Sequence, residues 1–126
     1  MSELNELLKQ LSEAAPELCG VLNTDSGTPA YRIICEDYHF CLYPTCTELL
    51  PWQKNDRTCA IARIRDWIVG QGWTVRCASG TYDGAILYMW EAGPTFHIEP
   101  LVECDNTDEL LVAIDCALAV AKEKTE

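Results

Sequence analysis

The sequence predicts an α+β protein in which an antiparallel β-meander is flanked by helices. Apolar residues recur at helical spacing in three segments and alternate with polar residues in several shorter ones. Glycine or proline separates most of these segments. With 126 residues, of which 48% are hydrophobic and 23% charged, the chain can form one globular domain with its own core. We therefore expect a single domain with the element order α-β-β-loop-α-β-β-β-α.

The N-terminal part of the chain, residues 1–51, is expected to contain a helix followed by a hairpin. An apolar stripe that includes Leu4, Leu8 and Leu11 predicts a helix over residues 2–15. The segment begins with a serine that can cap the helix and is followed by a proline, which are typical helix start and stop signals.

Two short strands and a linker are predicted next. Small and polar residues at 23–29 predict a loop. Residues 30–35 and 39–43 are rich in Tyr, Ile and Phe and predict two strands joined by a turn. Residues 45–50 lie between two prolines and are expected to be irregular, and residues 52–56 are expected to form an exposed linker.

The C-terminal part, residues 57–124, is predicted to form a helix, three strands and a closing helix. Asp56 is placed to cap the first helix, in which Ile64 and Ile68 lie on the core face together with a third isoleucine. Two glycines near residue 70 are expected to end this helix, because glycine adopts the left-handed conformation without strain.

The three strands of the meander are predicted from alternation. Residues 73–77, 85–90 and 95–102 alternate with period two, and residues 79–84 are expected to form a turn. Both faces of these strands carry apolar residues, so we expect both faces to be covered.

The closing helix is predicted from its start signal and its apolar side. Asn106 and Glu109 have the spacing of a reciprocal capping box. Leu111, Ile114 and Leu118 then lie along one side of the helix that follows.

The charge balance restricts the classes of partner. The chain has 20 acidic and 9 basic residues and a formal net charge of −11, which disfavours direct binding to duplex nucleic acid or to an anionic membrane. The first residues show no signal peptide, and the longest apolar stretch is interrupted by Asp115. We therefore expect a cytoplasmic protein whose eight cysteines are thiols or metal ligands.

Three segments of the C-terminal part are similar to a known family. They are the helix end Gly70–Trp73, the strand centred on Tyr88–Trp90 and the alanine-rich closing segment Ala113–Ala119. Through them, residues 58–124 resemble the phage ABA sandwich domain, found in small accessory proteins of phages and prophages. The resemblance implies an accessory protein of a mobile element that acts in the host cytosol against a host defence. It implies no catalytic residues.

The first functional hypothesis is non-catalytic binding of a basic surface. In this hypothesis the protein inhibits a host defence effector, as anti-CRISPR proteins that mimic DNA do, and it is not an enzyme. The expected contact residues share a carboxylate and lie near one strand end and one helix start: Glu99, Glu103, Asp105, Asp108 and Glu109. The alternative interpretation is a solvated acidic face, in which Asp108 and Glu109 serve only the helix dipole.

The second hypothesis is an oligomeric protein that sequesters a nucleotide. Five of the nine basic residues lie between positions 54 and 76, interleaved with tryptophans, and arginine near tryptophan can hold an anionic, stackable ligand. The expected ligand-binding residues are Trp52, Arg57, Arg63, Arg65 and Arg76. The alternative is that Arg63 pairs with Asp66 along a helix while the tryptophans pack in the core.

The cysteines and histidines are the candidates for a zinc site or an enzyme active site. Cys35, His39, Cys41 and Cys46 fall close together, and these residue types bind zinc. The spacing lacks the paired short knuckles of structural zinc sites, so we expect small core thiols and no cofactor. Neither His39 nor His97 stands at a recognisable offset from a nucleophile and an orienting group.

Overall fold

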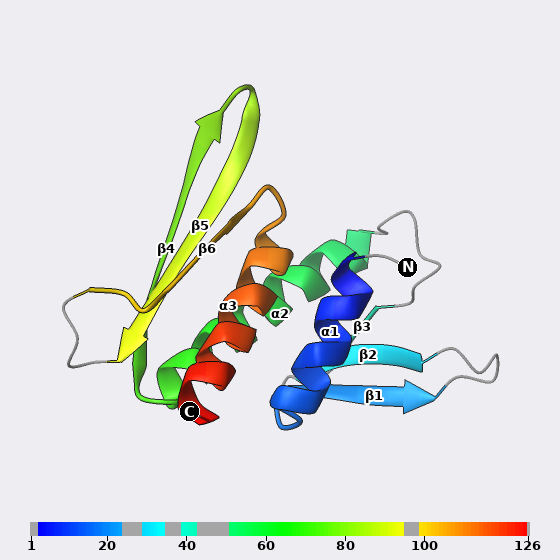
Figure 1. Ribbon diagram of the computed structural model, residues 1–126. Helices are drawn as coiled ribbons and strands as arrows, with labels where there is room; N and C mark the ends of the chain where they lie inside the picture. Colours follow the sequence, from blue (N-terminus) through cyan, green and yellow to red (C-terminus); the bar gives the residue numbers. More distant parts are fainter. Residues whose placement is uncertain (1–2, 24–28, 35–38, 43–50, 95–98, 126) are drawn as a thin grey trace. The chain divides into compact units, whose positions relative to one another are not determined.

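The computed structural model describes residues 3–23, 29–34, 39–42, 51–94 and 99–125. Over these ranges it contains three helices and two antiparallel three-stranded sheets (Figure 1). The predicted α+β class is confirmed. The chain divides into two compact units, residues 1–63 and residues 64–126. The predicted loop at 23–29 and irregular segment at 45–50 lie almost entirely outside the described residues.

The first unit contains α1 (Glu3–Ala14) and the sheet β1 (Cys19–Asn23), β2 (Pro29–Ile34) and β3 (His39–Leu42), in the order β1-β2-β3. The helix contacts β1 and β2. Its apolar stripe is buried at Leu8 and Leu11, as predicted, whereas Leu4 at the start of the stripe is half-buried. The helix and both predicted strands of this unit are confirmed.

Strand β1 was not expected from the sequence. It consists of Cys-Gly-Val-Leu-Asn, in which a glycine weakens the strand signal and only the valine is a strong strand former. The strand exists because it pairs along its whole length with β2, from Cys19↔Ile33 to Asn23↔Pro29. This pairing is a non-local interaction that the local pattern does not reveal.

Helix α2 (Pro51–Gly70) begins at the proline itself, so the prediction of a linker at 52–56 is wrong. Proline is favoured at the first helical position, because its φ is already helical and its missing N–H is not needed there. The predicted core face is confirmed at Ile64 and Ile68, which are fully buried, whereas the third isoleucine, Ile61, is half-buried. Gly72 ends the helix with a φ of 85°, as expected.

The second unit contains the sheet β4 (Trp73–Tyr82), β5 (Ala85–Pro94) and β6 (Val102–Asn106), in the order β4-β5-β6. Strands β4 and β5 pair over ten positions, whereas β6 pairs only with residues 88–92 of β5. The first two strands are therefore longer than the sequence predicted.

The turn between β4 and β5 consists of two residues and not of the whole segment 79–84. Tyr82 pairs with Ala85, and the two residues between them, Asp83 and Gly84, both have positive φ, 50° and 79°. An Asp-Gly pair with this conformation is a preferred two-residue hairpin connection, because its twist matches that of the strands. Because the turn needs only these two residues, β4 continues through residues 79–82.

The third strand begins where the predicted one ends. The prediction over 95–102 is wrong for residues 99–101, and residues 95–98 lie outside the described residues. Pro100 cannot donate a ladder hydrogen bond, and β6 starts after it with Val102 on the buried side.

The start of α3 (Glu109–Thr125) is capped by Asp108, which corrects the predicted capping box of Asn106 and Glu109. A side-chain oxygen of Asp108 accepts a hydrogen bond from the backbone N–H of Leu110 at 3.0 Å. The side chain of Asn106 accepts one from the backbone N–H of Asp108 at 3.0 Å. An aspartate at the N-cap satisfies one of the free N–H groups of the first turn.

Helix α3 packs on β5 and β6. It is buried on more sides than predicted: Ile114 and Leu118 are buried, Leu111 is only half-buried, and Leu110 and Val112 are fully excluded from solvent. A helix that is apolar around most of its circumference is expected to lie in the interior. Within the described part of the chain, no helix combines the length and apolar character needed to cross a membrane.

Candidate functional site

The candidate site is the outer face of the β4-β5-β6 sheet, defined here as the face opposite the one on which Trp90, Ala92 and Val102 are buried. Alternation along each strand decides which side chains reach it. It carries Thr74, Arg76, Ala78, Gly80 and Tyr82 from β4, Leu87, Met89, Glu91 and Gly93 from β5, and Glu103 and Asp105 from β6.

Charged side chains form one row across the outer face. Arg76 pairs with Glu91, and Glu91 pairs with Glu103, so the three lie on neighbouring strands at one level. At the next level Met89 pairs with Asp105. Because facing side chains of paired strands are about 5 Å apart at Cβ, Glu91, Glu103 and Asp105 form one continuous group. We call these three residues the acidic edge.

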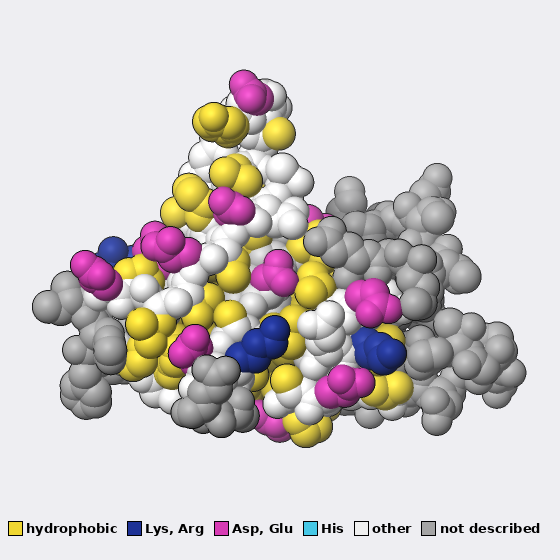
Figure 2. All heavy atoms as spheres, in the orientation of Figure 1, with side chains coloured by type: hydrophobic (Ala, Val, Ile, Leu, Met, Phe, Trp, Pro, Cys, Tyr) yellow, Lys and Arg dark blue, Asp and Glu magenta, His cyan; other side chains and the backbone are white. Residues whose placement is uncertain are grey.

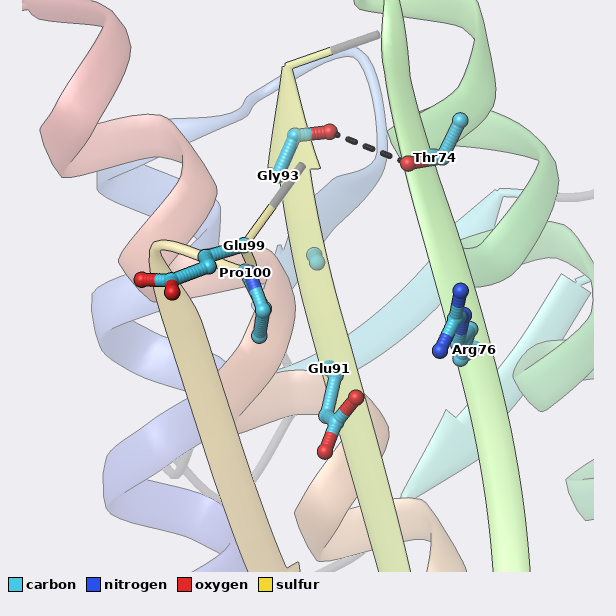
Figure 3. A pocket seen from close by; sticks show the side chains of 7 residues that line it. Thr74, Arg76, Glu91, Gly93, Glu99 and Pro100 are labelled. Carbon is cyan, nitrogen blue, oxygen red and sulfur yellow. Dashed lines mark hydrogen bonds between the residues drawn. The ribbon is translucent and has the colours of Figure 1, made fainter. Parts of the chain in front are cut away.

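A small hollow lies beside this row. It has a volume of about 90 Å³, and Arg76, Glu91 and Glu99 contribute to its wall. Figure 3 shows Arg76 and Glu91 on neighbouring strands, with the carboxylate of Glu99 pointing away from both. The hollow is small beside the several hundred Å³ typical of ligand pockets, so it suits waters or a single side chain of a partner.

Because Gly93 has no side chain, residues 99–101 can lie against β5 at this position. A Cβ atom at this position would come within 3.3 Å of the Cα of Pro100. The carbonyl of Gly93 accepts a hydrogen bond from Thr74 Oγ1 at 3.3 Å (Figure 3). The backbone N–H of Leu101 donates to the carbonyl of Ala92 at 2.9 Å. These contacts place Glu99 at the rim of the outer face.

A wider, open hollow of about 410 Å³ lies further along the same face. Its walls are formed by Arg76, Cys77, Ala78, Met89 and Glu91. It is mostly apolar with one basic and one acidic side chain at its border, which is a composition suited to contact with another protein surface.

Of the five residues predicted to contact a partner, the structure brings Glu103 and Asp105 together on the outer face and places Glu99 at the wall of the small hollow that Glu91 also lines. Both β6 carboxylates are exposed. Asp108 instead caps α3, and Glu109 is half-buried in the first turn of that helix.

Glu91 is a site residue that the sequence interpretation missed. It lies directly beside Glu103, but the predicted strand ended at residue 90. Continuing the alternation of Leu87 and Met89 by one more step would have placed Glu91 on the same face.

The arginines predicted to bind a nucleotide differ in their contacts and positions where the structure describes their side chains. Arg63 Nε donates to the carbonyl of Ile34 at 3.1 Å. Arg65 lies beside the Cys77 thiol, which belongs to the inner side of the sheet, whereas Arg76 lies on the outer face. The side chains of Trp52 and Arg57 lie outside the described residues. The nucleotide hypothesis stays a prediction.

The predicted zinc ligands fall largely outside the described residues. Cys35 and Cys46 are not described, and His39 and Cys41 are described only as backbone positions that share one face of β3. Among the residues that the structure does describe, there is no group of three or more His, Cys, Asp or Glu side chains placed to hold a metal ion.

Three thiols gather on the inner side of the sheet. Cys77 and Cys104 are the strand partners of Trp90 on its two sides, and Cys116 approaches Cys104 from α3. A hydrogen bond from Cys116 lowers the pKa of the Cys104 thiol, and the same bond together with burial raises the pKa of Cys116. Burial raises the pKa of Cys77, opposed by the charge of Arg65. The sequence did not single out these three cysteines.

The far end of the β4–β5 hairpin extends beyond β6. Residues 80–87, which we call the hairpin arm, pair only with each other because β6 reaches no further than Tyr88. Tyr82 is 72% exposed and Ile86 is 52% exposed. Figure 2 shows the arm with apolar side chains and an acidic residue at its surface. The prediction that both faces of the meander are covered is therefore wrong for the arm.

Comparison of the chain with models of known protein families, with characterised proteins and with solved structures finds no match. The resemblance of residues 58–124 to the phage ABA sandwich domain stays a prediction.

Proposed function

We propose that this protein acts by non-catalytic binding, and that it inhibits a host defence effector by presenting its acidic edge to a basic surface of that effector. The observation that supports this proposal is the contiguity of Glu91, Glu103 and Asp105 on one face of a paired sheet. The net charge of −11 favours the same class of partner at long range.

The sheet gives these carboxylates a fixed spacing. Neighbouring strands lie about 4.8 Å apart, and residues two positions apart on one strand are about 6.7 Å apart. A partner surface that binds the regularly spaced phosphates of a nucleic acid carries lysines and arginines for that purpose. Carboxylates on a paired sheet can occupy such a surface with less loss of backbone conformational entropy than carboxylates on a mobile loop.

The partner class, an anti-CRISPR-like target, comes from the resemblance to phage accessory proteins and from the acidic composition. Such an inhibitor needs no active site. It needs only a surface that competes with nucleic acid for the effector, and the acidic edge is the described surface that fits this requirement best.

The first experiment tests the binding surface directly. In one variant, lysine replaces each residue of the acidic edge, Glu91, Glu103 and Asp105. A matched control makes the same change of charge at three exposed carboxylates elsewhere, Glu13, Asp66 and Glu123. Calorimetry with an arginine-rich peptide is expected to show at least about a tenfold loss of affinity for the first variant and a much smaller loss for the control.

The second experiment tests the biological target. Cells with an active CRISPR–Cas system would express the native protein or either variant, and the plating efficiency of a targeted phage would be measured. The native protein and the control variant are expected to raise plating efficiency, and the acidic-edge variant is expected not to. Equal behaviour of both variants in the peptide and plating measurements would contradict the proposal.

A further inference from the structure

Two of the thiols on the inner side of the β4-β5-β6 sheet are in direct contact. Cys104 lies on β6 and Cys116 lies on α3, and the thiol of Cys116 donates a hydrogen bond to the sulfur of Cys104. Helix α3 packs on β6, and both elements belong to the unit formed by residues 64–126. The packing of the helix on the sheet therefore holds two sulfur atoms next to each other.

The two thiols differ in their access to solvent. Cys116 is fully buried, whereas Cys104 is half-buried on a strand at the end of the sheet order. A small molecule in solution therefore reaches the sulfur of Cys104 before that of Cys116.

The same hydrogen bond makes the two thiols differ in reactivity. It lowers the pKa of the Cys104 thiol, against the opposing effects of burial and of the charges of Asp115 and Asp105. The pKa of the Cys116 thiol is raised by this bond and by burial. Since the thiolate is the nucleophile, Cys104 is the thiol expected to react first.

We propose that Cys104 and Cys116 form a site of reversible oxidation, at which a hydroperoxide converts the two thiols into a disulfide between β6 and α3. An accessible cysteine beside a second, resolving cysteine is the arrangement typical of redox-sensitive thiols. The proposal does not rest on the proposed function, because it concerns the inner side of the sheet and not the acidic edge.

The reaction takes place in two steps, written here for hydrogen peroxide. The sulfur of Cys104 attacks one peroxide oxygen, so that an S–O bond forms, the O–O bond breaks, and the second oxygen leaves as water with the proton of this thiol. The sulfur of Cys116 then attacks the resulting sulfenic acid, so that the S–S bond forms and the S–O bond breaks. The oxygen leaves as a second water with the proton of Cys116. The two thiols lose two electrons, and these reduce one peroxide to two waters.

Cys77 serves as a comparison thiol on the same side of the sheet. It is exposed, but it lies on β4, with Trp90 of β5 between it and Cys104. Two strand spacings amount to about 10 Å, whereas the Cα atoms of a disulfide are usually less than about 7 Å apart. Exposure alone is therefore not enough for Cys77 to bond with Cys104.

The experiment is peptide mapping of the native chain after brief treatment with equimolar hydrogen peroxide and alkylation of the remaining thiols. Proteolysis after glutamate places Cys104 in residues 104–109, Cys116 in residues 110–123 and Cys77 in residues 49–91. The first two peptides are expected to be recovered joined to each other and to separate after dithiothreitol, because disulfide formation is reversible by thiol exchange. The peptide that contains Cys77 is expected not to be joined to either of them.

Three variants assign the steps, and circular dichroism checks the fold of each. Cys116→Ala is expected to stop the reaction at the sulfenic acid of Cys104, which dimedone traps. Cys104→Ala is expected to leave Cys116 reduced, because this thiol is fully buried. Cys77→Ala is the matched control and is expected to leave the joined peptides unchanged.

The native chain by itself can contradict the proposal. Peptides 104–109 and 110–123 that stay separate at every peroxide concentration would overturn it. An equal yield of the joined pair from a chain unfolded in urea would also overturn it, because the contact in the folded chain would then play no part.

Discussion

The two ends of the β4–β5 hairpin share the same strands and the same continuous pairing, yet their surroundings differ. At the end near α3, Trp73, Trp90 and Ala92 are buried. At the other end, Tyr82 and Ile86 are largely exposed. The first end is part of the core of its unit, and the second depends on strand pairing and the Asp-Gly turn alone.

Within this one hairpin, the buried end contributes to stability and the exposed end is available for binding. Apolar burial contributes about 25 cal/mol per Å² of surface removed from water, and only the buried end obtains it. A two-stranded ribbon without a covered face is marginally stable by itself. The arm is therefore held in place by the core at its base, and its exposed apolar side chains remain available for contact with another molecule.

The largest expected effect tests the buried end. Trp90 is 2% exposed and lies at the centre of the inner face. Trp90→Ala is expected to lower the free energy of unfolding by about 3–5 kcal/mol, through lost burial and the cavity left behind. Urea denaturation followed by circular dichroism measures this change.

The matched variant at the exposed end is Tyr82→Ala. Since this side chain is 72% exposed, its removal is expected to change the free energy of unfolding by less than about 0.5 kcal/mol. Similar losses for Trp90→Ala and Tyr82→Ala would show that the two ends do not differ as the structure indicates.

The second prediction concerns the turn that holds the arm. Gly84 has a φ of 79°, and a Cβ atom added there would meet no other atom within 4 Å, so the effect of a side chain is confined to the backbone. Gly84→Ala is expected to destabilise the arm by about 1–2 kcal/mol. Amide exchange in residues 80–87 should become about fivefold to thirtyfold faster.

Gly80→Ala is the control for the turn variant. This glycine also has open space where a Cβ atom would lie, but its φ is not in the left-handed region. Its replacement is expected to leave amide exchange in the arm nearly unchanged. An equal acceleration in both variants would mean that the turn conformation does not hold the arm.

The third prediction tests the helix that covers the buried end. Asp108→Ala removes the side chain that accepts the hydrogen bond from the N–H of Leu110. It is expected to lower the free energy of unfolding by about 1 kcal/mol. Asp108→Asn retains an acceptor at the cap and should lose less. Asp105→Ala, at an exposed carboxylate nearby, should have little effect in the same thermal or urea measurement.

The smallest expected effect concerns the boundary between the buried and the exposed end of the β4–β5 hairpin. Cys77 lies at this boundary, and burial raises the pKa of its thiol while Arg65 opposes the shift. Only the thiolate reacts with iodoacetamide, so Arg65→Ala should raise the pKa further and slow alkylation at neutral pH a few-fold. Mass spectrometry of the Cys77 peptide, in dilute protein, gives the rate at each pH. An unchanged rate would show that Arg65 does not act on the Cys77 thiol.

Much of the helical structure was predictable because its signals are local. Leu8 and Leu11 of α1 and Ile64 and Ile68 of α2 repeat at the helical period, and all four are buried as expected. The start of α2 was missed because Pro51 was interpreted as a boundary and not as the first helical residue. Both interpretations of a proline are consistent with local sequence, and the surrounding structure decides between them.

The sheets were less predictable because pairing joins residues that are distant in sequence. The alternation in β4 and β5 assigned the faces correctly, with Trp73 and Trp90 on the buried side. It could not show that β6 pairs with residues 88–92 and leaves the arm uncovered, since that depends on where the segment after Pro100 meets β5. The acidic edge could not be predicted for the same reason, because Glu91 and Glu103 are neighbours only through the register between β5 and β6.

The class of the protein, its strong negative charge, the buried faces of its helices and the alternation of its strands could all be derived from the amino-acid sequence. These properties follow from residue type and from periodicities of a few residues. Three further properties emerge only in the folded chain: which carboxylates lie together, which thiols meet beside Trp90, and which end of the hairpin is exposed. They depend on non-local pairing and packing, where a shift of one residue in register would exchange the two faces of a strand.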